Sequence, residues 1–236
     1  VLMKRKVEVW VENGAGDKAF CPDAAYSSAG ARLTKREGII ASADILLSIH
    51  ADEVPASLQN KILIGVYQPL YKVSLMAAWA RQHLTAFSLD MLPRTTRAQN
   101  MDVLSSQASI AGYKAVLVAA NAFPRYFPMF MTAAGSIAPA RVLILGAGVA
   151  GLQAIATARR LGAVVEVFDT RPAVKEEVMS LGGKFIEVEG AADASGAGGY
   201  AVEQSETFQQ RQQEKIAAPL YWHEDEAFTH AGWRQR

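Results

Sequence analysis

The fold is decided by the stretch Ala140-Arg-Val-Leu-Ile-Leu-Gly-Ala-Gly-Val-Ala-Gly-Leu-Gln-Ala-Ile-Ala-Thr-Ala-Arg-Arg-Leu-Gly162. Its apolar run at 142–145 predicts a strand over 141–145, and a helical pattern follows. Between them lie three glycines in the spacing G-x-G-x-x-G: Gly146, Gly148 and Gly151. A second apolar run, 164–168, ends in Asp169. This order of strand, tight turn, helix, strand and acid is typical of a βαβ unit that binds a dinucleotide.

Each residue of this motif has a separate physical role. Gly146 lets the chain turn sharply out of the strand, and Gly148 lets a pyrophosphate approach the backbone closely. Gly151 lets the helix pack tightly on the sheet. The free N–H groups and the positive dipole end of the helix face the phosphates. We expect the Asp169 carboxylate to accept hydrogen bonds from an adenosine ribose.

Composition narrows the function classes. Lys and Arg number 24 and Asp and Glu 23, so the net charge of +1 indicates no nucleic-acid partner. Cys21 is the only cysteine, which excludes an internal disulfide or a cysteine-based zinc cluster and fits a reducing cytosol. No uninterrupted apolar run reaches the ~18 residues of a membrane span, and we expect no direct membrane insertion.

Strand and helix patterns alternate along the first half of the chain. Alternating or apolar runs predict strands at 7–12, 43–50, 61–67 and 84–89. Helical patterns lie at 22–29, 73–83 and 101–122. The strand at 43–50 is mostly apolar, so we expect it to be buried on both faces. Residues 132–140 are typical of a hinge or linker, and a last strand is expected at 184–188. This alternation predicts an α/β fold with parallel sheets.

Polar side chains cluster just before and inside the long helix. They are Arg94, Arg97, Gln99, Asp102, Ser105, Ser106 and Gln107. Helical spacing would place Asp102, Ser105 and Ser106 on one face near the helix start. Two interpretations remain open on pattern alone. Asp102 caps the helix and the arginines are solvated, or the cluster forms part of a binding site.

Four segments together carry a family resemblance. They are Pro93-Arg-Thr-Thr-Arg-Ala-Gln-Asn-Met-Asp-Val-Leu-Ser-Ser-Gln107, Ala111-Gly-Tyr-Lys-Ala115, Met131-Thr-Ala-Ala-Gly135 and 146–162. In this order they closely resemble the NAD(H)-binding domain of the alpha subunit of proton-translocating NAD(P) transhydrogenases, from about residue 6 to about residue 216. The alanine dehydrogenases share this fold. The resemblance implies two Rossmann-like parallel-sheet domains around a cleft, of which we expect the second to be incomplete.

The resemblance also implies roles for individual residues. The residues implied at the nicotinamide end of NAD(H) are Arg94, Gln99, Asp102 and Ser105, of which the first three are the candidates for catalysis. Further nucleotide contacts are implied at Val149, Asp169, Thr170 and Arg171. A mobile loop that closes over the nucleotide would include Gly199 and Tyr200, with a later contact from Gln212. No metal site is implied.

The implied activity is direct hydride transfer between NAD(H) on this chain and NADP(H) on a partner domain. The resemblance further implies a membrane domain on another chain, a homodimer of this domain, and a peripheral place at the cytoplasmic face of the membrane. Such a domain needs no acid or base of its own, because hydride passes between two nicotinamides and the protein supplies position and electrostatics.

Two alternatives remain open. An alanine-dehydrogenase-like enzyme would resemble this chain but carry a lysine and a histidine where Ser48 and Gln68 stand, and neither of these can bind and protonate a 2-oxo acid. His50 is expected to be a surface histidine at the end of its strand. The other alternative is a truncated, non-catalytic NAD-binding fragment.

The expected domains are 1–132, an N-terminal α/β domain that includes the long helix; 133–216, the first half of the NAD(H)-binding Rossmann domain; and 217–236, a divergent tail. An opening strand and helix of the family are expected to be missing before Val1. We expect the tail to be a truncated or frame-altered end. Its polar residues resemble metal ligands only weakly, since adjacent side chains cannot all face one ion: His223, Glu224, Asp225, Glu226 and His230.

Overall fold

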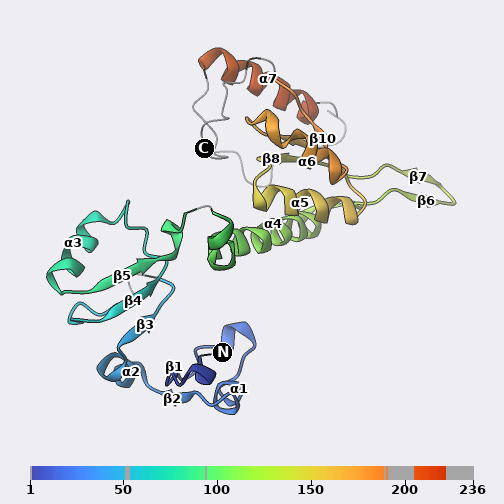
Figure 1. Cartoon of the computed structure of the whole chain (residues 1–236). Coiled ribbons are helices and arrows are strands. Elements are labelled where there is room, and N and C mark those ends of the chain that lie inside the picture. The colour runs from blue at the N-terminus through green and yellow to red at the C-terminus, as the bar shows by residue number, and fades with distance from the viewer. Residues whose placement is uncertain (1, 51–53, 94, 189, 191–204, 222–236) are drawn as a thin grey trace. The chain divides into compact units, whose positions relative to one another are not determined.

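The structure, a computed structural model, describes residues 2–50, 54–93, 95–188, 190 and 205–221. For residues 218–221 it describes the backbone alone. The chain divides into two compact units, Val1–Leu104 and Ser105–Arg236. Figure 1 shows helices and short strands in both units. Each unit contains a three-stranded parallel sheet, which confirms the predicted α/β class.

The first unit contains two parallel sheets. The smaller pairs β1 (Trp10–Glu12) with β2 (Arg32–Thr34). The larger has the order β3-β4-β5, formed by Ile45–Leu47, Ile62–Gly65 and Thr85–Ser88. Its helices are α1 (Asp23–Ser28), α2 (Arg36–Ser42) and α3 (Val73–Arg81). Short 3-10 turns lie at Met3–Arg5, Asp17–Ala19, Leu89–Met91 and Thr96–Met101. The strands predicted at 7–12, 43–50, 61–67 and 84–89 are present but shorter, whereas β2 and α2 were not predicted.

The larger sheet of the first unit buries only one face of β3. Leu46 packs against a core formed by Leu63, Tyr67 and Trp79, while Ile45 and Leu47 are 50% and 71% exposed. The prediction that this strand is buried on both faces is therefore wrong. An apolar sequence allows a strand to be buried on both faces, but the second face is buried only if another layer covers it. Among the described residues, no such layer covers Ile45 and Leu47.

The second unit is built on a sheet with the order β10-β9-β8, all parallel. Its strands are Arg141–Leu145 (β8), Val164–Phe168 (β9) and Lys184–Phe185 (β10). Its helices are α4 (Val103–Ala122), which begins just before the unit boundary, α5 (Val149–Arg160), α6 (Lys175–Ser180) and α7 (Glu206–Tyr221), with a 3-10 turn at Pro172–Val174. β8 and β9 have their predicted bounds, whereas β10 is shorter than the predicted 184–188.

One face of this sheet carries the core, and the other carries a buried charge. Ile155, Val165, Val167 and Val178 are at most 2% exposed between the sheet and its helices. On the opposite face of β9 the side chain of Glu166 is 7% exposed. Both its carboxylate oxygens accept hydrogen bonds from Arg141 Nη2 at 3.0 Å, and Lys184 Nζ lies 3.4 Å away. Since the three residues come from β8, β9 and β10, the ion pairs tie the strands together.

Helix α4 packs on the second unit. A Cβ atom added to Gly112 would lie 2.0 Å from the backbone oxygen of Ala150, so only glycine permits this approach of α4 to α5. Val116, one turn further on, belongs to the core of the unit. The contacts thus group nearly all of α4 with the second unit, and the domain boundary at 132 stays a prediction. By length and composition alone α4 could cross a membrane, a test that core helices of soluble proteins also pass.

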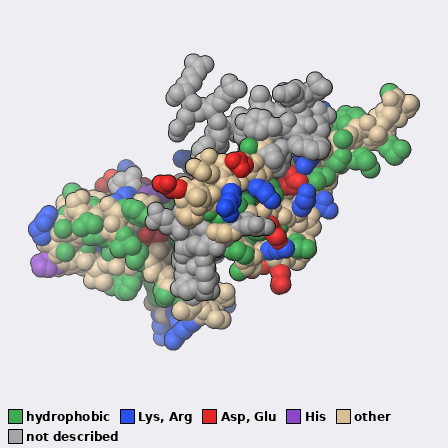
Figure 2. Space-filling view, turned by 90° about the horizontal axis from the view of Figure 1, so that it is seen from above, with side chains coloured by type: hydrophobic (Ala, Val, Ile, Leu, Met, Phe, Trp, Pro, Cys, Tyr) green, Lys and Arg blue, Asp and Glu red, His purple; other side chains and the backbone are tan. Residues whose placement is uncertain are grey.

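The segment predicted as a linker contains a β-hairpin. β6 (Phe130–Thr132) and β7 (Gly135–Ile137) pair antiparallel around a tight turn at 133–134, and Gly135, the first residue of β7, has φ +129°. Thr132 Oγ1 donates to the Gly135 carbonyl at 3.0 Å and accepts from the Ala134 N–H at 3.2 Å, which closes the turn. Met131 is 83% exposed, and Figure 2 shows hydrophobic side chains over the hairpin at the right of the view. Residues 132–137 of the predicted linker are therefore part of a β-hairpin.

Candidate functional site

The glycine turn joins β8 to α5, and its three glycines differ in what surrounds them. Gly146 has φ +98°, a conformation that side-chain-bearing residues rarely adopt, and its N–H donates to Phe168 O at 2.7 Å. A Cβ atom on Gly151 would lie 1.8 Å from Gly146 O, so glycine is required where the helix meets the turn. Among the residues that the structure describes, a Cβ atom on Gly148 would meet nothing within 4 Å. Space is therefore open at the position where the motif predicts a pyrophosphate.

Helix α5 begins directly at this open space. Gly148 is its N-cap residue, with φ −78° and ψ −169°, and its carbonyl accepts the N–H of Leu152 at 2.8 Å. Val149, the first helical residue, is 41% exposed. The first N–H groups of a helix have no partner within the helix and carry the positive end of its dipole. The turn therefore has the donors and the field that an anion requires.

Asp169 lies next to the turn and is held by four hydrogen bonds. Its Oδ2 accepts the Ala147 N–H at 2.7 Å and Arg171 Nη2 at 2.9 Å. Its Oδ1 accepts the Arg171 backbone N–H at 2.8 Å and Arg171 Nε at 2.9 Å. The Asp169 side chain is only 6% exposed. This carboxylate therefore connects the end of β9 to the glycine turn.

Opposing effects act on the pKa of Asp169. Burial raises the pKa of this carboxyl, but the hydrogen bonds from Arg171 and Ala147 and the charge of Arg171 outweigh burial, so the pKa is lowered from 3.8. The same side-chain hydrogen bond raises the pKa of Arg171. At neutral pH the pair is an ionised, bidentate salt bridge.

The residues predicted at the nicotinamide end lie on two different elements. Gln99 is exposed on the 3-10 turn Thr96–Met101, and Asp102 is half-buried directly before α4. Ser105 is half-buried in the first turn of α4, where its carbonyl accepts the hydroxyl of Ser109 at 3.1 Å. Arg94 lies outside the described residues. The predicted helix began at 101, so the 3-10 turn that carries Gln99 was not anticipated.

The packing of α4 orients Ser105. Ser105 and Gly112 are seven residues apart, which is two helical turns, so they share one face of α4. Gly112 contacts Ala150 in the first turn of α5, beside Gly148. Ser105 therefore lies on the face of α4 that meets α5, about 10.5 Å along the helix axis from that contact. Within the second unit, the contact of Gly112 with Ala150 thus places Ser105 on the side of α4 that faces the start of α5.

The other predicted site residues have different outcomes. Thr170 is half-buried directly after Asp169, and Gln212 is half-buried on α7. Gly199 and Tyr200 lie outside the described residues, as do the polar residues of the tail from His223 to His230. Among the residues that the structure describes, no three side chains are grouped as ligands for a metal ion.

A polar network not predicted from the sequence lies at the carboxyl end of the larger sheet of the first unit. Ser48 Oγ and the Tyr67 hydroxyl are 3.0 Å apart. The Tyr67 N–H donates to Ser88 Oγ at 2.9 Å, and the Ser88 hydroxyl donates to Asp90. Tyr67 is completely buried and meets Trp79 edge-on at 5.0 Å. Because a lone tyrosine at a strand end carries no pattern, only the fold could reveal this network.

Ser48 and Gln68, where an alanine-dehydrogenase-like enzyme would carry a lysine and a histidine, are part of this network or next to it. Ser48 is bonded to a buried tyrosine, and Gln68 has the left-handed φ of +52° just after β4. His50 is exposed, as predicted.

Comparison with known proteins identifies the family. Models of the N-terminal and C-terminal domains of "Alanine dehydrogenase/PNT" match residues 1–111 and 115–221. A relative from Rhodospirillum rubrum, named as the first part of an NAD(P) transhydrogenase subunit alpha, is 45% identical over 224 residues, which cover 90% of this chain and 58% of that protein. An alanine dehydrogenase of Mycobacterium tuberculosis is 27% identical over 175 residues, covering 71% of this chain and 47% of that enzyme.

A solved structure agrees with this result. The transhydrogenase from Sinorhizobium meliloti superposes with a TM-score of 0.74 at 47% identity, over 79% of this chain and 57% of that one. The chain thus spans a little under three fifths of the length of these transhydrogenase relatives. The two domain models together match 1–111 and 115–221, which is most of the chain. The chain belongs to the alanine dehydrogenase/PNT family.

Proposed function

We propose that this chain is the NAD(H)-binding part of a proton-translocating NAD(P) transhydrogenase. The observation that carries the proposal is the glycine turn of the second unit, where the space over Gly148 is open and Asp169 is fixed beside it. The greater similarity to transhydrogenase alpha subunits than to alanine dehydrogenase, 45% against 27% identity, supports the choice within the family.

The residues have distinct tasks in this proposal. NAD(H) supplies the nicotinamide that gives or takes a hydride. The backbone at Gly148 and the first turn of α5 bind its pyrophosphate, and Asp169 binds its adenosine ribose. Gln99 is neutral and has donor and acceptor groups, so it can hold a carboxamide at any pH. Positioning of this kind is the main contribution a protein makes to a direct transfer between two cofactors.

The proposal includes partners. The NADP(H)-binding domain and the membrane domain would lie on other chains, and this chain would form a homodimer at the cytoplasmic face of the membrane without entering it. The relatives named as alpha subunits, or as a portion of one, support an assembly of several chains. Asp169 supports a preference for NAD(H), because a 2′-phosphate would meet its negative charge.

The alternative of an alanine-dehydrogenase-like enzyme has less support. Such an enzyme needs a cation and a proton donor for a 2-oxo acid. The network at the sheet edge of the first unit has Ser48 bonded to the buried Tyr67 hydroxyl, and Gln68 follows Tyr67 directly. A lysine side chain at 48 would have to displace that hydroxyl. The second alternative, a non-catalytic NAD-binding fragment, has the same nucleotide site and differs from the proposal only in turnover.

Three assays separate the proposals. Fluorescence titration of the purified chain with NADH tests the site, and NADPH should bind more weakly. Hydride transfer from NADH to an NADP⁺ analogue, measured with a supplied NADP(H)-binding domain of a transhydrogenase, tests the activity. Binding without transfer would favour the non-catalytic fragment, and NADH oxidation that depends on pyruvate and ammonia would favour the dehydrogenase. Equal affinity for NADH and NADPH would contradict the assigned role of Asp169.

A further inference from the structure

We infer that Arg171 occupies the ribose position of the nucleotide site in the free protein and must leave Asp169 when NAD(H) binds. This inference rests on the proposed function, because it concerns the carboxylate that would hold the adenosine ribose. In place of the direct nucleotide contact that the family resemblance implies for Arg171, the inference makes this residue a competitor for the Asp169 carboxylate. Arg171 acts through Asp169 as a positioning residue that sets nucleotide affinity and discrimination.

The Asp169 carboxylate has no remaining acceptor capacity. An ionised carboxylate offers about four lone-pair positions. Arg171 N–H and Nε fill the two at Oδ1, while the Ala147 N–H and Arg171 Nη2 fill the two at Oδ2, all between 2.7 and 2.9 Å. A ribose hydroxyl can therefore bond to this carboxylate only if one of these donors leaves.

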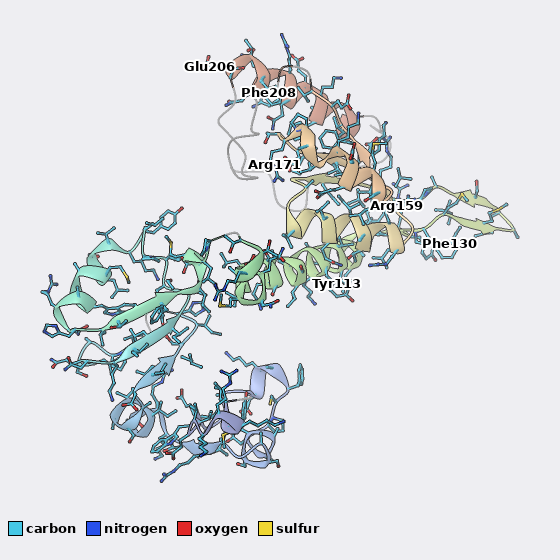
Figure 3. The ribbon with its side chains drawn as sticks, in the orientation of Figure 1. Tyr113, Phe130, Arg159, Arg171, Glu206 and Phe208 are labelled. Atoms are coloured by element: carbon cyan, nitrogen blue, oxygen red, sulfur yellow. The ribbon has the colours of Figure 1, made fainter. Side chains whose placement is uncertain are left out.

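The four donors differ in how easily they can leave. The Ala147 N–H belongs to the glycine turn and the Arg171 N–H to the chain just after β9, so both are fixed by the backbone. The Arg171 guanidinium is at the end of a long side chain that is 20% exposed, and solvent can receive it. The exchangeable pair is therefore Nε and Nη2, one on each carboxylate oxygen. Figure 3 labels Arg171 in the second unit.

The guanidinium pair and a ribose have matching donor patterns. The planar fork of arginine donates two parallel hydrogen bonds to the two oxygens of a carboxylate. The 2′- and 3′-hydroxyls of a ribose form a similar pair of neighbouring donors. The ribose diol can thus take the two acceptor positions that the guanidinium vacates, while both backbone donors stay. A ligand that lacks one hydroxyl would leave one of these buried positions unfilled, which costs affinity.

Nucleotide binding must therefore break a charged hydrogen-bond pair, and that cost lowers the affinity. Replacement of Arg171 by alanine removes the competitor and leaves Asp169 with its two backbone donors. The affinity for ligands with a complete ribose diol should then rise. The affinity for NADPH should not rise, because its 2′-phosphate still meets the Asp169 charge and no longer has a nearby cation.

The test compares Arg171→Ala and Arg171→Lys with a matched control, Arg160→Ala. Arg160 is an exposed arginine at the end of α5, in the same unit. Binding of ADP-ribose, NADH, NADPH, AMP and 2′-deoxy-AMP is measured by calorimetry, with thermal unfolding as a check of the fold. We expect Arg171→Ala to bind ADP-ribose and NADH about tenfold more tightly, or about 1.4 kcal/mol, with no gain for NADPH or 2′-deoxy-AMP. Lysine should give a smaller gain, since it lacks the fork.

The outcomes separate the inference from the proposed function. Nucleotide affinity in folded Arg171→Ala that is unchanged, weaker, or raised equally for AMP and 2′-deoxy-AMP overturns the role of Arg171 while leaving the site intact. If the alanine variant does not fold, the lysine variant decides by the same comparison. Addition of Asp169→Asn should abolish the gain. If the wild-type chain and every variant are folded and none binds an adenine nucleotide, the proposed function fails and the inference fails with it.

Discussion

Gly148 and Gly151 lie in the same turn and offer a sharp test of the site, because their surroundings are opposite. A Cβ atom on Gly148 meets no described atom within 4 Å, and the φ of −78° and ψ of −169° at Gly148 are open to any residue. Alanine there loses some N-cap preference, about 0.5–1 kcal/mol. It regains about 0.4–1 kcal/mol because the unfolded chain has less freedom. We expect Gly148→Ala to fold with nearly unchanged stability.

The same substitution at Gly151 should damage the fold. Its Cβ atom would lie 1.8 Å from the oxygen and 2.8 Å from the carbon of the Gly146 carbonyl. Both are backbone atoms, so no side chain can rotate away, and the turn or α5 must move by about 1.6 Å to bring the 1.8 Å contact to the 3.4 Å of an ordinary one. Overpacking of this kind typically costs about 1–3 kcal/mol and sometimes more. Gly151→Ala should therefore lower the free energy of unfolding clearly relative to Gly148→Ala.

Gly148→Ala, which should leave the fold stable, should instead lower the nucleotide affinity. The methyl group of Gly148→Ala would fill the open space over the first turn of α5 and keep a pyrophosphate from the backbone N–H groups. Loss of one hydrogen bond to a charged group is worth about 1.5–3 kcal/mol, or roughly 10- to 100-fold in affinity. Urea unfolding followed by circular dichroism, with NADH fluorescence titration, measures both effects. Normal NADH affinity in Gly148→Ala, or equal stability of the two variants, would refute the reasoning.

Four further predictions concern other parts of the chain. Gln99→Ala should slow hydride transfer in the assembled enzyme about 100-fold with little loss of NADH affinity, since displacement of a reacting atom by about 1 Å has such an effect; normal transfer with much weaker binding would make Gln99 a binding contact only. Because the pKa of Asp169 is lowered in the folded state, this carboxylate stabilises the fold above the ordinary value of 3.8, and the stabilisation is lost as pH falls through the lowered pKa. A plot of the free energy of unfolding against pH should therefore be flatter in this range for Asp169→Asn than for the wild-type chain. Glu166→Gln should cost about 1–3 kcal/mol by weakening its bonds to two cations, measured by urea unfolding. Gly112→Ala should destabilise the second unit by about 1–3 kcal/mol, since its Cβ atom would lie 2.0 Å from a backbone oxygen of α5; an unchanged unfolding curve would show that α4 does not pack there.

The elements of the structure agree best with their predicted bounds where the sequence pattern is long and periodic. β8 and β9 have the predicted bounds, and α4 begins within two residues of its predicted start. Apolar strands beside a glycine turn leave few structural alternatives, because a tight turn, a helix and a parallel strand are all constrained at once. The elements that were missed are short or contain a helix breaker. β2 has three residues, and α2 contains Gly38 in the middle of its sequence.

Sequence reasoning failed where a contact between distant or differently oriented groups decides the structure. Residues 132–140 are predicted to be a linker because their glycine and polar residues are typical of loops, whereas 132–137 belong to the hairpin of β6 and β7. The tight turn uses the same residue types, and only the cross-strand pairing distinguishes the two. Asp169 was expected beside the nucleotide, but its four-donor environment was not, since it depends on where the guanidinium of Arg171 and the Ala147 N–H point.

The two units show how one architecture can offer a ligand site in one place and close it in another. Parallel α/β sheets bind ligands beyond the carboxyl ends of their strands. In the first unit the buried Tyr67 fills this edge, bonded to Ser48 and Ser88, and a Cβ atom on Gly65 would already lie 2.0 Å from Ser48 O. In the second unit the corresponding edge is open over Gly148. The nucleotide is therefore expected at the second sheet, whereas among the described residues the carboxyl edge of the first sheet is filled by the hydrogen-bonded side chain of Tyr67.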